Sequence, residues 1–229
     1  LRTPLTTING YADMLAQGFA GALSDRQKEP MAAIQMAAEH LAKLVDDILD
    51  VAAIDAGQLE LDLGDVDVAD VAREAAELIQ ARADHHSIKL GVDVEGASGL
   101  IRADRNRIKQ VAMNLLSNAI RHVQTGGEVT IGARRSEDQL TLWVADDGEG
   151  IAPEKQATVF ERFSRGERGG AGLGLSLVKE IAQLHGGWVE LQSEPGKGTK
   201  VSCHFPSEPH GNAVPPELDL ARRPASGRA

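Results

Sequence analysis

Two asparagines four residues apart, Asn114 and Asn118, are the first residues whose type and spacing suggest chemistry. They lie in residues 105–123, where apolar residues recur with helical spacing, so a helix would present both carboxamides on one face, with Arg121 and His122 about one turn further. A carboxamide oxygen is a neutral, hard ligand that suits a magnesium ion already carrying triphosphate charge. An ordinary solvated helix face has the same spacing, so the pair alone leaves both interpretations open.

A carboxylate followed by two glycines forms a second pattern, in the segment V-A-D-D-G-E-G-I at residues 144–151. Asp146 would lie at the end of an apolar strand, where its carboxylate could accept a hydrogen bond from the exocyclic amine of adenine. Gly148 and Gly150 would let the backbone approach a flat ring closely. A plain acidic turn is the alternative for this segment taken alone.

The third pattern is the glycine-rich segment G-G-A-G-L-G at residues 169–174, which leads directly into a helical stretch at residues 175–184. Glycines ahead of a helix N-terminus leave unpaired N–H groups that can bind phosphate. The segment lacks the Lys-Ser/Thr pair of a P-loop, and no strand precedes it as in a dinucleotide-binding fingerprint. In isolation it is equally consistent with a mobile loop.

The composition limits what can position these residues. The chain has 229 residues, 42% of them hydrophobic and only 3% aromatic, so aliphatic side chains must build the core. This length predicts a short module and a domain of roughly 150 residues. A formal net charge of −10, with scattered Lys and Arg, argues against nucleic acid as a partner. The single cysteine, Cys203, lies in an alternating apolar run and is expected to be a buried thiol in a reducing compartment.

Residues 1–57 have the pattern of two helices. Along residues 1–19 the apolar positions alternate in steps of four and three, which is a heptad seam. A second helix is expected after Ser24, with Gln27 placed as in a capping box. Its seam consists of Ile34, Ala37, Leu41, Leu44, Ile48 and Val51. Two antiparallel helices with narrow seams cannot enclose a core alone, so we expect a homodimer with a four-helix bundle made from two chains. Packing of both helices on the rest of the same chain is the alternative.

Beyond Gly57 the apolar period changes, which predicts a domain boundary near residues 57–64. Period-two alternation, typical of strands, occurs at residues 59–63, 88–94, 129–133, 140–144, 188–191 and 200–205. Helical spacing occurs at residues 68–83, 105–123 and 175–184. Short polar turns join 129–133 to 140–144 and 188–191 to 200–205, as in antiparallel hairpins. The pattern predicts a mixed sheet covered by helices on one face, an α/β sandwich at residues 58–207, and then a disordered tail at residues 208–229.

In their order along the chain, these motifs resemble the sequence boxes of bacterial sensor histidine kinases. The asparagine pair resembles the N box, residues 146–150 the first glycine box, F-E-R-F at residues 160–163 the F box, and residues 170–174 the second glycine box. L-R-T-P-L at residues 1–5 resembles the second half of the phosphoacceptor motif, His-Glu-Leu-Arg-Thr-Pro-Leu. The resemblance covers residues 1–206. It implies an α+β fold, in which a dimerising helical hairpin (residues 1–57) precedes a catalytic ATP-binding sandwich of the histidine kinase, gyrase and MutL type (residues 58–207).

The resemblance implies a phosphate-binding side of the site. Asn114 would be the magnesium ligand, and Asn118 would lie beside the nucleotide phosphates. Arg121 stands where the family usually has a phosphate-binding lysine, which keeps the charge but changes the geometry. Arg165 is similar to the arginine that reaches the terminal phosphate. The residues that would close over the triphosphate are Gly170, Gly172, Leu173 and Gly174.

The resemblance also implies an adenine-binding side. Asp146 would receive the adenine amine, Gly148 and Gly150 would form the loop beside it, and Ile151 would wall the ring. His122 replaces a common tyrosine that flanks adenine; a half-buried ring without that role is the alternative. Thr199 ends the turn G-K-G-T, which resembles a further glycine motif of the family, and is included among the nucleotide-binding residues.

The implied activity is that of a protein-histidine kinase with ATP and Mg²⁺ as cofactors. The γ-phosphoryl group would pass to a histidine two places before Leu1, and then to an aspartate of a response-regulator receiver domain. Thr3 falls where the family places a residue that orients water for dephosphorylation of the regulator. The chain as printed is therefore expected to bind ATP without forming phosphohistidine.

Two other functions stay open at this point. A pseudokinase would keep the fold and hold a regulator without autophosphorylation, and the short segment at residues 164–169 between the boxes could weaken closure over a nucleotide. An ATPase of the gyrase or MutL kind would share the ATP site, but the heptad hairpin and the Leu-Arg-Thr-Pro run argue against it. No apolar run reaches the ~18 residues of a membrane span, and no signal-peptide pattern opens the chain. We therefore expect a cytoplasmic piece without direct membrane contact, whose parent protein could itself be anchored.

Overall fold

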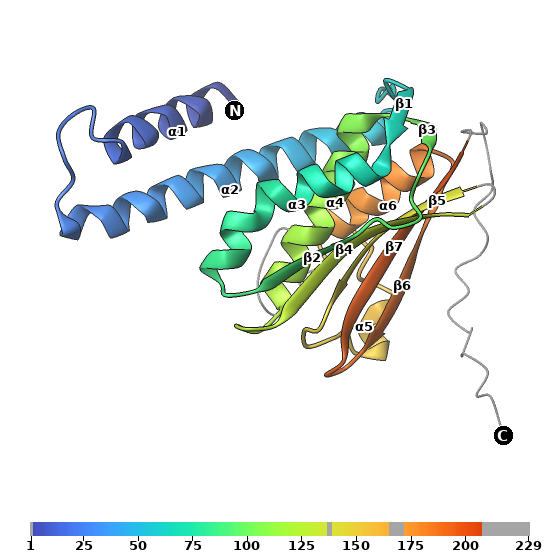
Figure 1. Ribbon diagram of the computed structural model, residues 1–229. Coiled ribbons are helices and arrows are strands. Elements are labelled where there is room, and N and C mark those ends of the chain that lie inside the picture. Colours follow the sequence, from blue (N-terminus) through green and yellow to red (C-terminus); the bar gives the residue numbers. More distant parts are fainter. Residues whose placement is uncertain (1, 137–138, 165–171, 208–229) are drawn as a thin grey trace. The chain divides into compact units, whose positions relative to one another are not determined.

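The computed structural model describes residues 2–136, 139–164 and 172–207, without the side chains of Arg2, Thr3 and Glu39. The chain divides into two compact units, Leu1–Glu60 and Leu61–Ala229 (Figure 1). The first is a helical hairpin and the second is built around a sheet.

The hairpin consists of α1 (Arg2–Ala16) and α2 (Asp25–Asp55). Ser24 is the N-cap of α2, and its backbone N–H donates to Oε1 of Gln27 over 2.9 Å, as the sequence predicts. Gly18 and Gly21 make the turn between the helices with φ of 80° and 106°, values that side chains disfavour. The capping box and the turn glycines of the hairpin can therefore be recognised in the sequence.

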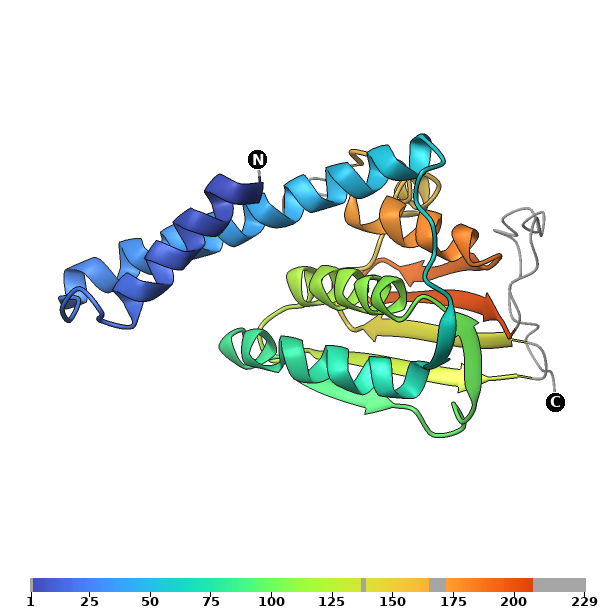
Figure 2. The same ribbon diagram turned by 90° about the horizontal axis from the view of Figure 1, so that it is seen from above.

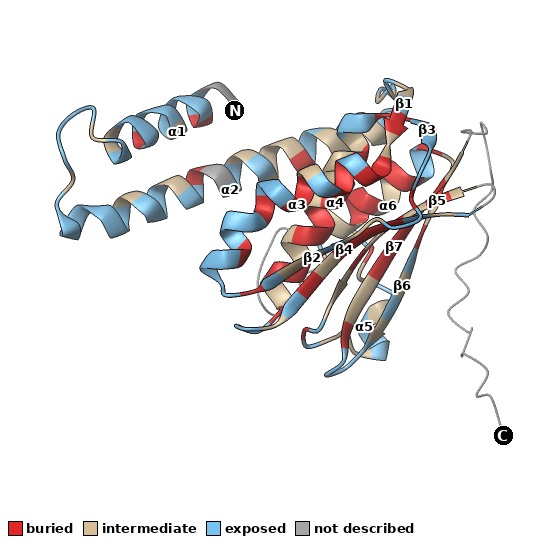
Figure 3. Ribbon diagram, viewed as in Figure 1, coloured by how far each residue is buried: buried red, intermediate tan, exposed pale blue. Residues whose placement is uncertain are grey.

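The two helices bury little apolar surface on each other. Leu5, Ala12 and Ala38 are the apolar side chains buried in the described hairpin. Seam residues such as Ile34, Leu41 and Ile48 are about half exposed, at 49%, 49% and 52%. Most of the surface of α1 and α2 is exposed or intermediate (Figure 3). The seam predicted from the heptad pattern is therefore present and uncovered.

The second unit contains two sheets and four helices among its described residues. In chain order these are β1 (Gly64–Asp67), α3 (Val68–His85), β2 (Lys89–Asp93), β3 (Leu100–Ala103), α4 (Arg105–His122), β4 (Glu128–Arg135), β5 (Gln139–Asp146), α5 (Pro153–Gln156), α6 (Gly174–Leu184), β6 (Trp188–Glu194) and β7 (Gly198–Pro206). The large sheet has the order β2-β4-β5-β7-β6, and β1 pairs with β3 in a small antiparallel sheet. Only the β2–β4 pairing of the large sheet is parallel. Helices α3, α4 and α6 cover one face of it (Figure 2).

This architecture confirms the α/β sandwich and both predicted hairpins, β4–β5 and β6–β7. Alternate residues of the strands, such as Leu140, Leu142 and Val144 on β5, are buried under the helices. Cys203 is fully buried there as expected, and burial raises the pKa of its thiol.

Two parts of the sequence-based prediction were wrong or incomplete. Residues 59–63 alternate but form no strand; pairing begins at Gly64, and the N–H of Asp62 donates to the Asp104 side chain instead. Strand β3 and helix α5 were not expected, because each is only four residues long and leaves little periodic signal.

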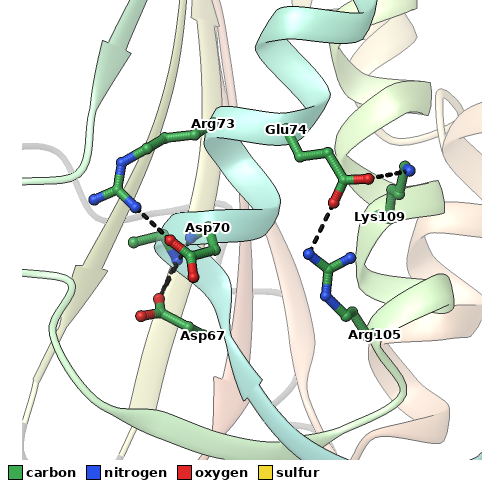
Figure 4. A network of polar contacts seen from close by, with 7 residues as sticks. Asp67, Asp70, Arg73, Glu74, Arg105 and Lys109 are labelled. Carbon is green, nitrogen blue, oxygen red and sulfur yellow. Dashed lines mark hydrogen bonds and ion pairs between the residues drawn. The ribbon is translucent and has the colours of Figure 1, made fainter.

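Side-chain caps and one ion-pair network fix α3 and α4. Asp67 caps α3 by accepting from the backbone N–H of Ala69 over 2.9 Å. Glu74 on α3 binds both Arg105 and Lys109 on α4, and these hydrogen bonds hold the pKa of its carboxyl below the usual range (Figure 4). The helix that carries the asparagine pair is thus tied to its neighbour.

A buried histidine joins α6 to the start of α4. Nε2 of His185 accepts from the backbone N–H of Asp104 over 3.0 Å, and Nδ1 donates to the carbonyl of Ile181 over 2.8 Å. The carboxylate of Asp104 in turn caps α4, accepting from Asn106 and Arg107. His185 is only 2% exposed, and burial lowers its pKa. Both ring nitrogens are engaged only in the neutral tautomer with the proton on Nδ1.

Candidate functional site

Asp146 ends β5 on the helix-covered face of the sheet. Its Oδ1 accepts from the N–H of Gly148 over 2.9 Å, and the backbone N–H of Thr199 on β7 also bonds to this carboxylate. Burial raises the pKa of Asp146, while the two N–H groups and nearby His122 oppose that shift. The side chain is half-buried, so the fixed acceptor is still partly accessible.

The glycines around Asp146 are required by close backbone contacts. A Cβ on Gly148 would lie 2.7 Å from the His122 carbonyl oxygen, and one on Gly150, which has φ of 68°, would lie 2.1 Å from the carbonyl oxygen of Glu194. Contacts this short exclude any side chain. The loop predicted after β5 therefore lies tightly against the ends of α4 and β6.

Two hydroxyl groups, those of Ser193 and Thr199, lie on the strands next to Asp146. Ser193 on β6 contacts Thr199 on β7, with 2.9 Å between Oγ and Oγ1, and its Oγ accepts from the N–H of Ile151 over 2.8 Å. Nε2 of Gln156 donates to the carbonyls of both Ile151 and Ser193. Thr199 thus pairs with Asp146 across β5 and β7, and the N–H of Ile151 contacts Ser193. Ser193 and Gln156 were missed, because their contacts depend on the β6–β7 register.

On α4, Asn114 faces inward and is only 5% exposed. Its Nδ2 is buried and has no hydrogen-bond partner among the described residues. Because the oxygen and nitrogen of a carboxamide exchange positions when the group turns over, the side chain can offer either atom to a ligand. Leaving such a group unpaired costs about 1–3 kcal/mol, so a ligand that pairs with it is favoured.

The donor set fits a magnesium ion that is held mostly by a nucleotide. Asn114 offers one neutral oxygen, and Asn118, one turn further, is half-buried. No cluster of three or more His, Cys, Asp or Glu side chains suited to a metal occurs in the part of the chain that the structure describes. Magnesium typically keeps several waters and binds substrate phosphates, so a single protein oxygen is compatible with such an ion.

Basic side chains gather at the end of α4. Burial lowers the pKa of Arg121, and the positive charge of Arg82 on α3 lowers it further. Nη1 of Arg82 also donates to Oγ of Ser117 over 3.1 Å. Two guanidinium groups close to each other favour an anion. Arg82 was not predicted from the sequence, because it lies on another helix.

His122 is placed between α4 and the loop after β5. Its Nδ1 lies 2.8 Å from Oε1 of Glu149. The contact holds the ring against the loop after β5; its role beside adenine stays a prediction.

The last part of the site is the start of α6. Leu173 is buried and occupies the N-cap, without a side-chain cap for the first N–H groups. Gly172 has φ of 68°, and its carbonyl accepts from the N–H of Phe163 over 2.9 Å. Gly174 follows with open space around its Cβ position. The F-box region is joined to α6 by Arg162 and Glu180.

Three predicted site residues lie wholly or partly outside the described residues. Arg165 and Gly170 lie outside the described residues. Thr3 lies in the first turn of α1, but its side chain is outside the described part of the structure.

Comparison with known families matches both units. The His Kinase A (phospho-acceptor) domain matches residues 1–57, and the histidine kinase-, DNA gyrase B- and HSP90-like ATPase domain matches residues 103–209. The first of these matches separates the kinases from the other ATPases that share the second domain. The chain belongs to the sensor histidine kinase family.

Histidine kinases also dominate the individual similarities. The sensor protein DivL of Caulobacter vibrioides is 44% identical over 95% of this chain, and the circadian input-output histidine kinase CikA of Synechococcus elongatus is 34% identical over 98%. The full-length ShkA structure in complex with AMPPNP has a TM-score of 0.74 and 32% identity over 89% of this chain. The chain spans only 28%, 31% and 43% of these three proteins. No described helix is long and apolar enough to cross a membrane.

Proposed function

We propose that the chain is a kinase core that binds magnesium-ATP and transfers its γ-phosphoryl group to a histidine, from which it passes to a response-regulator aspartate. The observation that carries the proposal is Asp146, a half-buried carboxylate held by two backbone N–H groups at the end of β5. Helix α4 adds the buried amide of Asn114, whose Nδ2 has no hydrogen-bond partner among the described residues. A fixed acceptor for an adenine amine and a buried ligand for a nucleotide-bound cation are what such a site needs.

In this proposal each side of the site has its own task. Asp146 and Thr199 accept the adenine amine, Ile151 and His122 flank the ring, and the loop of Gly148 and Gly150 admits it. Magnesium, when bound with the nucleotide, would neutralise phosphate charge. Asn114 would be its protein ligand.

The phosphates would be held by cations and backbone groups. Asn118 and Arg121 would bind them from α4, and Arg165 would reach the terminal phosphate. The uncapped first turn of α6 would donate its N–H groups to them. The closing segment would be formed by Gly170, Gly172, Leu173 and Gly174. Because little covalent chemistry falls to the protein, positioning supplies most of the catalysis.

The hairpin would belong to the domain that carries the acceptor histidine, and it would bind the partner proteins. Its uncovered seams would pair in a homodimer, and the receiver domain of a response regulator would dock on the resulting bundle, with Thr3 serving the reverse dephosphorylation. Since ATP and receiver domains are cytoplasmic, the proposal places this part of the protein in the cytoplasm.

Labelling with γ-labelled ATP tests the transfer step. The printed chain should bind ATP but acquire no acid-labile label, because the resembled motif has its acceptor histidine two places before Leu1. A chain extended at its N-terminus by the motif's His-Glu, with enough preceding helix to fold, should become labelled. The matched control carries Gln-Glu at the same places and should not.

Two outcomes would contradict the proposal. Acid-labile label on the printed chain would place the acceptor elsewhere. An extended chain that binds ATP but stays unlabelled would favour the second candidate, a pseudokinase that holds a response regulator without autophosphorylation; the short segment at residues 164–169 would then be the first suspect.

A further inference from the structure

The hydroxyl of Ser193 makes three hydrogen bonds, which use its whole capacity. Its Oγ lies 2.8 Å from the N–H of Ile151, 3.0 Å from the carbonyl oxygen of Gly198 and 2.9 Å from Oγ1 of Thr199. A hydroxyl has one proton to donate and accepts two hydrogen bonds. No position is left for a further partner.

The chemistry of the three neighbours decides the direction of each bond. The amide of Ile151 can only donate, so Ser193 accepts from it. The carbonyl of Gly198 can only accept, so it takes the single proton of Ser193. Thr199 must therefore donate its own hydroxyl proton to Ser193, and what remains at Oγ1 of Thr199 is lone pairs alone.

Strand register places this oxygen beside Asp146. Thr199 pairs with Asp146 on β5 and with Ser193 on β6, so all three side chains project from the same face of three adjacent strands. Thr199 and Asp146 are both half-buried. The edge of the site therefore presents two neighbouring oxygens, a carboxylate and a hydroxyl without a free proton, that can only accept.

Gln156 keeps this arrangement in place. Its Nε2 donates to the carbonyl of Ile151 over 2.8 Å and to that of Ser193 over 3.0 Å. One side-chain amide thus ties the loop after β5 to β6, which maintains the short distance from the N–H of Ile151 to Ser193.

We propose that Ser193 is a positioning residue that sets base specificity: by taking the proton of Thr199, it makes this edge accept an amino group and reject a carbonyl. This inference rests on the proposed nucleotide site and extends it. A 6-aminopurine has two N–H groups for the two acceptors. A 6-oxopurine places a third acceptor against them, and a mismatch of this kind is discriminated more strongly than a missing contact.

The test compares the dissociation constants of ATP and inosine triphosphate, which has an oxygen in place of the 6-amino group, for the wild-type chain and for Ser193→Ala. Without Ser193, the Thr199 hydroxyl can turn and donate to the 6-oxo group. The preference for ATP should therefore fall roughly three- to tenfold, mainly because inosine triphosphate binds more tightly. The matched control is Ser202→Ala, which removes a hydroxyl from the opposite face of β7 and should leave the preference unchanged.

A second variant keeps the test decisive if Ser193→Ala fails to fold. Thr199→Val removes one acceptor without adding a donor, so ATP should bind more weakly, while inosine triphosphate, relieved of one opposing acceptor, should bind no more weakly than to the wild-type chain. If either folded variant binds ATP and its preference for ATP over inosine triphosphate is unchanged or larger, the proposed role of Ser193 is wrong. A wild-type chain that binds neither nucleotide would instead overturn the proposed function, so the two failures are distinguishable.

Discussion

The hairpin and the sheet-containing unit solve the problem of burying apolar surface differently. In the described hairpin, burial is confined to three small or medium apolar side chains, while Ile8, Leu41 and Ile48 are about half exposed. The sandwich instead encloses a continuous layer between its large sheet and α3, α4 and α6. One unit has a complete core and the other has an apolar seam without a cover. This contrast indicates that the sandwich is stable by itself and that the hairpin needs a partner.

Introducing charged residues into the hairpin seam should have the largest effect on the difference between the two units. Leu41→Glu together with Ile48→Glu would place like charges inside a four-helix bundle, at a cost of several kcal/mol for each unpaired buried ion. We expect the dimer to dissociate, which light scattering would show as a halved molar mass.

A matched control uses exposed apolar residues of the other unit. Leu78 and Val92 are exposed to similar degrees, at 57% and 44%, so Leu78→Glu with Val92→Glu adds the same charges where no dimer seam is proposed. The mass should then be unchanged. An intact dimer in the hairpin variant, or a monomeric wild-type chain, would refute the assignment of the seam.

The stability of the sandwich should depend on pH, because this unit buries a neutral histidine. Burial holds the pKa of His185 below its usual value of 6.5, with Asp104 raising it and Arg107 lowering it. Above pH 6.5 neither state binds this proton. Below it the unfolded chain takes up the proton first, so the free energy of unfolding falls, by about 1.4 kcal/mol per unit of pKa difference. His204, whose pKa burial also lowers, adds to the same trend.

Tryptophan fluorescence isolates this effect, since both tryptophans of the chain, Trp143 and Trp188, lie in the sandwich. The denaturant midpoint at each pH is the right quantity, because Trp188 stacks on His204 and its intensity can change with protonation alone. His185→Gln, which does not titrate, should flatten the dependence between pH 7 and pH 5. An unchanged slope would mean that His185 does not couple proton uptake to unfolding.

The sequence predicts most of the fold because periodicity reports one-sided burial. Helix α4 was expected at residues 105–123 and spans Arg105–His122, since a 3.6-residue period over five turns is hard to mistake. The same reasoning failed at residues 59–63. Leu59, Leu61 and Leu63 are half-buried in alternation, but the pattern does not say whether an extended segment finds a strand to pair with.

The site was predictable where a motif carries the chemistry within one segment. Asp146 with its glycines, and Asn114 with Asn118, could be recognised because the strand end and the helix face lie within a few residues. Ser193, Gln156 and Arg82 could not, because their importance arises from strand register and helix packing between distant segments. A serine on an edge strand has no local feature that reveals its contact with Thr199.

Binding of magnesium-ATP measured by calorimetry tests the central claim most directly, comparing the wild-type chain with Asp146→Asn and its neighbour Asp147→Asn. Both variants lose one charge, but the Asp147 side chain accepts from the backbone N–H of Glu128, a contact that the asparagine oxygen keeps. Losing a hydrogen bond to a charged acceptor costs about 1.5–3 kcal/mol. We therefore expect Asp146→Asn to weaken ATP binding roughly ten- to a hundredfold, with Asp147→Asn close to wild type. Equal ATP affinity in all three proteins, or no ATP binding by the wild-type chain, would contradict the account.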